Sequence, residues 1–156
     1  FDRILNRPDM PLTRCNKENY STTRVIHYPS YTGHIEKKQM RIGEHSDYGT
    51  ITLLWQINDV PGLEVQDLDG AWHPVPYAED GVVCNIGDLL QRWTNDYFKI
   101  TKHRVLNTHI DQERWSMPHF VDPQPGTMVE NLTSETAKYE PIESLAYLKW
   151  RLAQSY

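Results

Sequence analysis

An imidazole and a carboxylate stand two positions apart in the segment Gly43-Glu44-His45-Ser46-Asp47. In an extended strand, side chains at positions i and i+2 point to the same face, so His45 and Asp47 can grip one metal ion together. Two ligands leave the coordination of an ion incomplete, and a third must come from another part of the fold. Ferrous iron uses such a donor set, two histidines and one carboxylate on one face with the other positions open.

The pair is a weak signal when it is taken alone. The chain contains seven histidines and has a second such triplet, His109-Ile110-Asp111. That second triplet falls in a polar connection, residues 108–113, where a solvated turn explains it. What distinguishes the first triplet is the sequence around it.

A series of short motifs surrounds and follows the first triplet in a fixed order. They read HSDYGTITLLWQ at 45–56, VPGLEV at 60–65, WHPVP at 72–76, VCNIGDLL at 83–90, HRV at 103–105 and RWS at 114–116. In this order and spacing, the chain resembles the C-terminal catalytic region of the isopenicillin N synthase-like, 2-oxoglutarate- and Fe(II)-dependent oxygenases. The resemblance covers residues 24–122, nearly two-thirds of the chain.

The resemblance implies a metal centre made by His45, Asp47 and His103, with Fe(II) as the metal and with 2-oxoglutarate and O2 at the open positions. His103 follows Asp47 by 56 positions, so it must come from a separate strand, as a facial triad requires. The alternative for His103 is a core histidine that hydrogen-bonds to the backbone.

The resemblance also implies that Arg114 and Ser116 bind the distal carboxylate of 2-oxoglutarate. The two positions share one face of a strand. A guanidinium offers a carboxylate two parallel N–H donors, and a hydroxyl adds a third. The alternative for Arg114 is a surface charge that pairs with Glu113 or Asp111.

Two further positions complete the implied cosubstrate site. Tyr28 matches a family tyrosine whose hydroxyl reaches 2-oxoglutarate, but Ile26 stands where many plant members carry an asparagine that helps to hold it. Because Ile26 has no hydrogen-bond donor, another donor or a water molecule must serve, and Arg41 is a candidate. If residues 41–47 form a regular strand, Arg41 faces the metal; if the strand bulges at Gly43, Arg41 is exposed.

Two aromatic residues are candidates for the substrate pocket. Tyr48 directly follows the ligand Asp47, and Phe120 lies six residues after Arg114 on the same strand. Aromatic walls suit flat or apolar substrates, and ordinary packing inside a barrel explains both residues equally well. The predicted partner is a small-molecule substrate with a planar or aromatic part.

The reaction implied by the resemblance is a dioxygenase reaction. It oxidises a small organic molecule, most often by hydroxylation, and decarboxylates 2-oxoglutarate to succinate and CO2. A zinc hydrolase with the same three ligands is a second hypothesis, but it leaves Arg114 and Ser116 unexplained and offers only Glu44 as a nearby base. A third is a catalytically silent β-barrel that serves as a binding module, and the intact triad argues against it.

The elements that must position these residues are mostly short β-strands. Their spacing and the regular turn residues predict an all-β sandwich, jelly roll or barrel, and the resemblance specifies a mainly β fold with a double-stranded β-helix (jelly-roll) core. The expected strands are residues 23–28, 39–44, 50–56, 63–66, 71–75, 81–86, 103–107 and 114–120.

Two hairpins are expected among these strands. Residues 63–66 and 71–75 flank Asp69-Gly70, which is a strong hairpin signal. Residues 103–107 and 114–120 flank the polar connection and are expected to pair as the second hairpin.

Helices are scarce in the pattern. A short helix is expected over residues 88–93, after the Gly87 turn. A C-terminal helix is expected over residues 142–154, with Pro141 in its first turn and leucines at three- and four-residue spacing. Residues 124–135 carry turn residues with little periodicity and are expected to form a loop.

Three regions follow from this layout. Residues 1–23 are expected to be a linker or the remnant of a preceding helical region, residues 24–122 the oxygenase core, and residues 123–156 a loop and the C-terminal helix. Family members typically have about twice this length, and their N-terminal half closes the sheets and one side of the pocket. The resemblance therefore implies the N-terminal half of the same protein as a partner.

Composition and charge exclude other classes. The net charge of −5 argues against sequence-independent binding to nucleic acid, which requires a basic surface. No stretch approaches the ~20 apolar residues of a membrane span, so no membrane partner is expected. Two cysteines support no disulfide framework, which predicts a reducing compartment and a cytoplasmic location.

Overall fold

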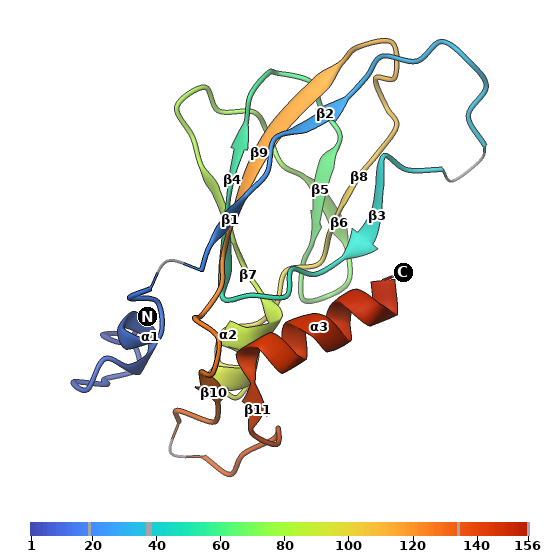
Figure 1. Ribbon diagram of the computed structural model, residues 1–156. Coiled ribbons are helices and arrows are strands. Elements are labelled where there is room, and N and C mark those ends of the chain that lie inside the picture. The colour runs from blue at the N-terminus through green and yellow to red at the C-terminus, as the bar shows by residue number, and fades with distance from the viewer. Residues whose placement is uncertain (19, 37–38, 134, 156) are drawn as a thin grey trace.

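Two antiparallel β-sheets face each other across a cavity in the computed structural model, which describes residues 1–18, 20–36, 39–133 and 135–155 (Figure 1). In the first sheet the strand order is β1-β9-β4-β7, and β2 also pairs with β9. These strands are β1 (Thr22–Thr23), β2 (Ile26–Tyr28), β4 (Ile51–Gln56), β7 (Val83–Ile86) and β9 (Arg114–Val121).

The second sheet has the strand order β3-β8-β5-β6. Its register pairs His45 of β3 directly with His103 of β8, so strand pairing alone makes the two imidazoles neighbours. The strands of this sheet are β3 (Ile42–His45), β5 (Leu63–Gln66), β6 (Trp72–Pro74) and β8 (His103–Val105).

One of the two expected hairpins is confirmed, and the other is wrong. β5 and β6 pair around a turn in which Gly70 has a φ of 87°. By contrast, β8 pairs with β3 and β5, whereas β9 pairs with β1, β2 and β4 in the other sheet. The polar residues between β8 and β9 do indicate a turn of the chain, but they do not indicate which strand pairs with which. This connection crosses from one sheet to the other.

The C-terminal helix α3 (Ser144–Ser155) begins two residues later than the sequence pattern predicts. The two preceding residues form β11 (Ile142–Glu143), which pairs with β10 (Met128–Val129) inside the segment expected as a loop. The carboxylate of Glu143 accepts hydrogen bonds from backbone N–H groups in the first turn of α3, and this cap determines where the helix starts. No helix in the described part of the chain has the length and hydropathy that a membrane span needs.

The main hydrophobic core lies at one end of the sandwich, where the short helices α1 (Pro11–Arg14) and α2 (Asp88–Trp93) and the longer α3 are found (Figure 1). The α2 bounds are those expected from the sequence. This apolar core lies outside the space between the sheets, where apolar side chains such as Leu54 and Leu63 share the cavity with the polar side chains of the site. The buried core residues are Leu12, Cys15, Leu89, Leu90, Trp93, Val129 and Tyr147.

Candidate functional site

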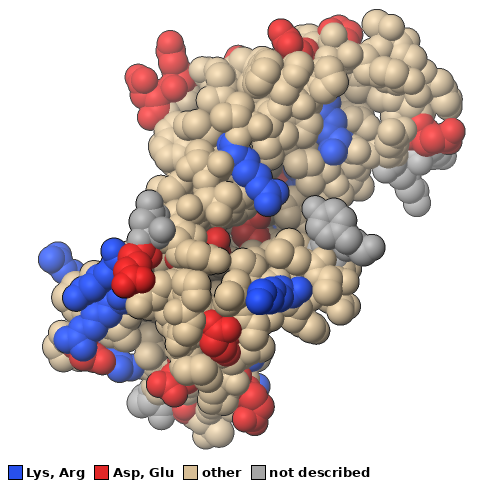
Figure 2. All heavy atoms as spheres, viewed as in Figure 1, with Lys and Arg blue, Asp and Glu red and all other residues tan. Residues whose placement is uncertain are grey.

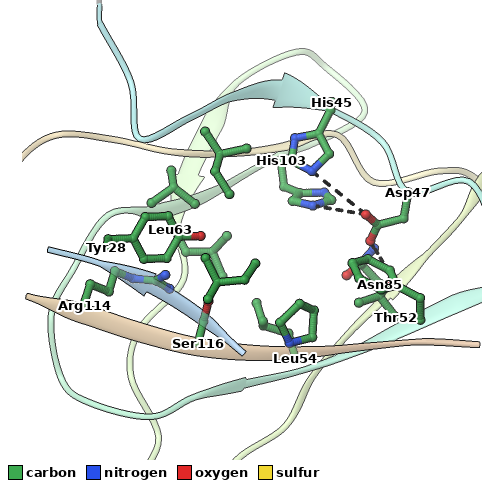
Figure 3. A pocket seen from close by; sticks show the side chains of 15 residues that line it. Tyr28, His45, Asp47, Thr52, Leu54, Leu63, Asn85, His103, Arg114 and Ser116 are labelled. Atoms are coloured by element: carbon green, nitrogen blue, oxygen red, sulfur yellow. Dashed lines mark hydrogen bonds and ion pairs between the residues drawn. The ribbon is translucent and has the colours of Figure 1, made fainter. Parts of the chain in front are cut away.

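The three predicted metal ligands come together at one end of the cavity between the sheets (Figure 3). His45 ends β3, His103 opens the neighbouring β8, and Asp47 follows β3 in the turn before β4. The Nε2 atoms of His103 and His45 lie 3.7 and 4.0 Å from Oδ1 of Asp47. Candidate ligand atoms of all three lie within 4.8 Å of one another, and the described residues contain no other such group.

Backbone carbonyls determine which nitrogen of each histidine faces the carboxylate. Nδ1 of His45 lies 2.8 Å from the carbonyl oxygen of Gly43, and Nδ1 of His103 lies 3.1 Å from that of Thr101. A carbonyl only accepts, so Nδ1 carries the proton and Nε2 keeps its lone pair for a metal. Burial and then the nearby His103 lower the pKa of His45, which favours the neutral, metal-binding form.

Asp47 is held by two polar side chains that sequence reasoning did not single out. Oγ1 of Thr52 and Nδ2 of Asn85 donate to Oδ2 of Asp47 over 2.6 and 2.8 Å. Thr52 and Asn85 are direct cross-strand partners, and all three side chains are buried. The other oxygen, Oδ1, faces the histidines and is left for a metal. The sequence signal for these supports was one polar residue inside each of two apolar strands.

The backbone of the turn that carries Asp47 is tied to the start of α2. The N–H groups of Gly87, Asp88 and Leu89 donate to three carbonyls within residues 47–50. A Cβ at Gly87 would lie 2.4 Å from the carbonyl oxygen of Gly49, so only glycine permits this approach. The glycine turn before α2 therefore positions the metal-binding turn.

The strand that carries His45 is irregular. The β3–β8 register shifts between Ile42 and His45, and both residues line the cavity although they are three positions apart. Arg41 does not line the cavity, and its Nη2 donates to the carbonyls of His109 and Gln112. Of the two alternatives for this strand, the structure has the irregular one, and the cosubstrate role of Arg41 stays a prediction.

The guanidinium of Arg114 is buried without a carboxylate partner among the described residues. Arg114 is 1 % exposed, its Nη2 donates to Oε1 of Gln56 at 3.3 Å, and its Nε and Nη1 have no hydrogen-bond partner there. Burial lowers the pKa of Arg114, because the charged form loses water. The alternative of a surface charge that pairs with Glu113 or Asp111 is wrong, since Arg114 is buried and the Glu113 carboxylate contacts the exposed His27.

The register of β2 and β9 gathers the remaining predicted cosubstrate residues around Arg114. Tyr28 pairs with Arg114, and Ile26 pairs with Ser116. All four line the cavity that also holds the triad, and Figure 3 shows Tyr28, Arg114 and Ser116 across the cavity from it. A buried cation with free N–H groups suits a carboxylate, and the triad suits a chelating ligand on a metal. These residues therefore fit Fe(II) together with 2-oxoglutarate.

A second hollow, open to solvent, adjoins the triad. Figure 2 shows this face hollowed between the sandwich and α3, with acidic side chains inside. Tyr48 and Phe120 both line the hollow, together with the oppositely charged Arg24 and Asp122. Burial and the charge of Asp47 raise the pKa of Asp122. The two aromatic residues predicted for the substrate pocket thus share one open space beside the metal ligands.

Comparisons with known proteins agree with this geometry. A model of the 2OG-Fe(II) oxygenase superfamily matches residues 15–123. Proline hydroxylase buaE of Petromyces alliaceus is 37% identical over 99% of this chain and 53% of its own length. The 2-oxoglutarate-dependent dioxygenase htyE of Aspergillus rugulosus is 37% identical over 97% of this chain and 51% of its own. The chain spans about half the length of these curated relatives.

Solved structures give the same result. A full-length Neurospora crassa protein in complex with alpha-KG has a TM-score of 0.79 and 37% identity, covering 87% of this chain and 45% of that one. A further full-length structure of the same Neurospora protein, with alpha-KG and thymine, also has a TM-score of 0.79 at 37% identity, covering 87% and 44%. The predicted mainly β fold with a jelly-roll core is confirmed. By its family match, its relatives and its site, the chain belongs to the 2OG-Fe(II) oxygenase superfamily.

Proposed function

We propose that the protein is an Fe(II)- and 2-oxoglutarate-dependent dioxygenase that oxidises a small organic molecule, with hydroxylation as the expected outcome. 2-Oxoglutarate is decarboxylated to succinate and CO2 in the same turnover. The observation that carries this proposal is one cavity that holds both a His/Asp/His triad and a buried guanidinium, two of whose nitrogens have no partner among the described residues. Bound iron supplies the oxidising chemistry with O2, while the side chains bind and orient the reactants.

The residues around Arg114 form the cosubstrate end of the cavity. Arg114 offers two unpaired N–H-bearing nitrogens to the distal carboxylate of 2-oxoglutarate, and Ser116 and Tyr28 add hydroxyl groups. Ile26 contributes an apolar wall and no donor. The guanidinium of Arg41 lies 5.7 Å from the Tyr28 ring centroid, and its buried Nη1 has no partner among the described residues. Arg41 is therefore proposed to act at this end of the cavity through its contact with the Tyr28 ring.

The open hollow is proposed as the substrate site. Tyr48 and Phe120 present aromatic surface, which suits a planar molecule. Arg24 and Asp122 supply a donor and an acceptor, so the substrate carries complementary polar groups. Relatives support small polar substrates, because one is named a proline hydroxylase and structures of the Neurospora crassa protein contain thymine or 5-formyluracil.

The two rival functions leave specific contacts unexplained. A zinc hydrolase needs a general base, but the carboxylate of Glu44 lies 2.8 Å from Nζ of Lys102 in an exposed ion pair. Neither the hydrolase nor a silent binding module accounts for the unpaired guanidinium of Arg114 inside the cavity.

Succinate formation tests the proposal. The purified chain, Fe(II), 2-oxoglutarate and O2 are incubated with a panel that contains cyclic amino acids such as proline and pyrimidines such as thymine. We expect the wild-type chain to form succinate only when iron is present, and at least one compound to increase the amount. We expect His103→Ala to form none. Succinate in the wild-type chain that does not exceed the level of His103→Ala contradicts the proposal.

We further propose that another segment of the same protein, the N-terminal half that the family resemblance implies, packs against this chain. Apolar side chains support this, because Val25, Tyr31 and Ile57 are 66%, 53% and 51% exposed. Exposed apolar side chains of this size are the groups that such a segment would cover. The segment would also close one side of the substrate hollow.

A further inference from the structure

Ser46 lies between two of the metal ligands in the sequence, and its side chain hydrogen-bonds to the start of α2. Ser46 is 8 % exposed, and its Oγ donates to Oδ1 of Asp88 over 2.8 Å. Asp88 is itself buried and is the first residue of α2. The metal-binding turn is therefore linked to a buried carboxylate through a side chain as well as through its backbone.

The other oxygen of that carboxylate is bound by the C-terminal helix. The hydroxyl of Tyr147 donates to Oδ2 of Asp88 over 2.9 Å, and Nη1 of Arg151 forms an ion pair with the same oxygen. Burying a carboxylate is unfavourable unless its oxygens are paired. Two side chains of α3 and the hydroxyl of Ser46 satisfy Asp88 together.

Arg151 also contacts both neighbours of the ligand Asp47 in the sequence. Its Nη2 donates to Oγ of Ser46 at 3.4 Å, and its guanidinium carbon lies 4.6 Å from the ring centroid of Tyr48. A guanidinium over an aromatic ring is attracted to the ring face. One side chain of α3 thus holds the residues on each side of Asp47.

We propose that Arg151 is a positioning residue for the metal, acting through Ser46, Asp88 and Tyr48 to fix the turn that carries His45 and Asp47. Leu148 and Leu152 of the same helix line the substrate hollow, so α3 both borders that hollow and holds the metal ligands. The inference rests on the metal-binding part of the proposed function.

The comparison of Arg151→Met with Lys149→Met tests the proposal. Lys149 is an exposed cation on the same helix, so the two variants remove the same charge from α3. Co(II) is titrated as a spectroscopic probe, and the melting transition is recorded for each protein. We expect Arg151→Met to bind Co(II) about tenfold more weakly and to shift the absorption bands. A tenfold loss is the low end of the range found when a residue that orients metal ligands is replaced. Lys149→Met is expected to behave as the wild type does.

Ser46→Ala adds a second variant that leaves the Asp88–Arg151 ion pair in place. We expect it to weaken Co(II) binding as well and to melt cooperatively, at a temperature lowered by the loss of one hydrogen bond to the buried Asp88. The double variant Ser46→Ala/Arg151→Met is expected to lose less affinity than the product of the two single losses, because both changes act on one network.

The possible results separate cleanly. Wild-type Co(II) affinity in Arg151→Met, or equal losses in Arg151→Met and Lys149→Met, overturns the proposal. If Arg151→Met does not fold, Ser46→Ala decides alone, and unchanged Co(II) affinity in that variant overturns it. A wild-type chain that binds Co(II) but forms no succinate contradicts the dioxygenase and leaves this test valid. A wild-type chain that binds no Co(II) contradicts both.

Discussion

The two oxygens of the Asp47 carboxylate have separate roles. Oδ2 accepts from Thr52 and Asn85, and this pairing fixes the plane of the carboxylate. Oδ1 faces the Nε2 atoms of His45 and His103. A buried carboxylate with one oxygen held and one directed at two imidazoles is preorganised for a metal, because little rearrangement accompanies binding.

Thr52→Val removes one of these supports with little change in volume. We expect metal affinity to fall about tenfold, because the loss of a hydrogen bond behind a metal ligand has an effect of that order. Titration with Co(II) measures it. Thr50→Val is the control, since the hydroxyl of Thr50 donates to the carbonyl of Val121 instead. Equal affinities of Thr52→Val and the wild type would show that Asp47 needs no such support.

Arg114→Lys keeps the charge at the cosubstrate end of the cavity but loses the planar pair of donors. Affinity for 2-oxoglutarate is expected to fall about 10- to 100-fold, which corresponds to the ~1.5–3 kcal/mol of a hydrogen bond to a charged group. The measurement is an anaerobic titration of 2-oxoglutarate with Fe(II) present. Arg104→Lys, whose guanidinium contacts Glu64 in the second sheet, is expected to retain the wild-type value. If Arg104→Lys loses more affinity for 2-oxoglutarate than Arg114→Lys does, the assignment of Arg114 is contradicted.

At the scale of elements, pairing between strands brings the site together. His45 and His103 are neighbours because β3 pairs with β8, and Tyr28 is next to Arg114 because β2 pairs with β9. The sequence was sufficient to predict that His45, Asp47 and His103 come together and that β5 and β6 form a hairpin, since motifs and turn residues are local signals. It was not sufficient to pair β8 correctly, because the partners of β8 are distant in the chain and tertiary packing selects them.

The same reasoning explains what was missed around β3 and Asp47. The irregularity in β3 that turns Arg41 away depends on the neighbouring strand β8, and the supports Thr52 and Asn85 meet Asp47 only after β4 and β7 pair. The alternation of apolar and polar residues along a single strand indicates neither the irregularity nor these contacts. An isolated polar residue inside an apolar strand is the local sign that could have indicated the supports.

The start of α3 makes stability depend on pH. Backbone N–H groups of Leu145, Gly126 and Ala146 lower the pKa of Glu143 to about 2 from the usual 4.5. A pKa that is depressed in the folded state adds stability that is complete above pH 4.5 and is lost as the pH falls towards about 2. Glu143→Gln does not titrate, so the difference in urea midpoint between wild type and variant should shrink across that range. A difference independent of pH contradicts the role of this carboxylate.

At the scale of the whole molecule, apolar packing and the site occupy different places. The helices and the N-terminal segment form the apolar core at one end of the sandwich, while the space between the sheets holds the triad and Arg114 (Figure 1). This division leaves a cavity between the sheets that is lined by both polar and apolar side chains. The division of the chain at residues 24 and 122 stays a prediction.

Exposed apolar surface affects how the isolated chain behaves. Val25, Tyr31 and Ile57 are more than half exposed, and the sheets have open edges. Because such groups associate when nothing covers them, we expect the 156-residue chain to self-associate in solution. Sedimentation analysis and thermal melting measure this. A monodisperse chain that melts cooperatively contradicts the expectation that a further segment covers this surface.

Anaerobic addition of Fe(II) and 2-oxoglutarate examines the metal and cosubstrate assignments in a single optical spectrum. The wild-type chain should give a weak visible charge-transfer band, because the triad and Arg114 hold iron and 2-oxoglutarate in one cavity. His45→Ala should abolish the band, whereas His109→Ala, which alters the second His-x-Asp triplet, should retain it. A band that survives unchanged in His45→Ala, or that the wild-type chain does not give, contradicts the proposed dioxygenase.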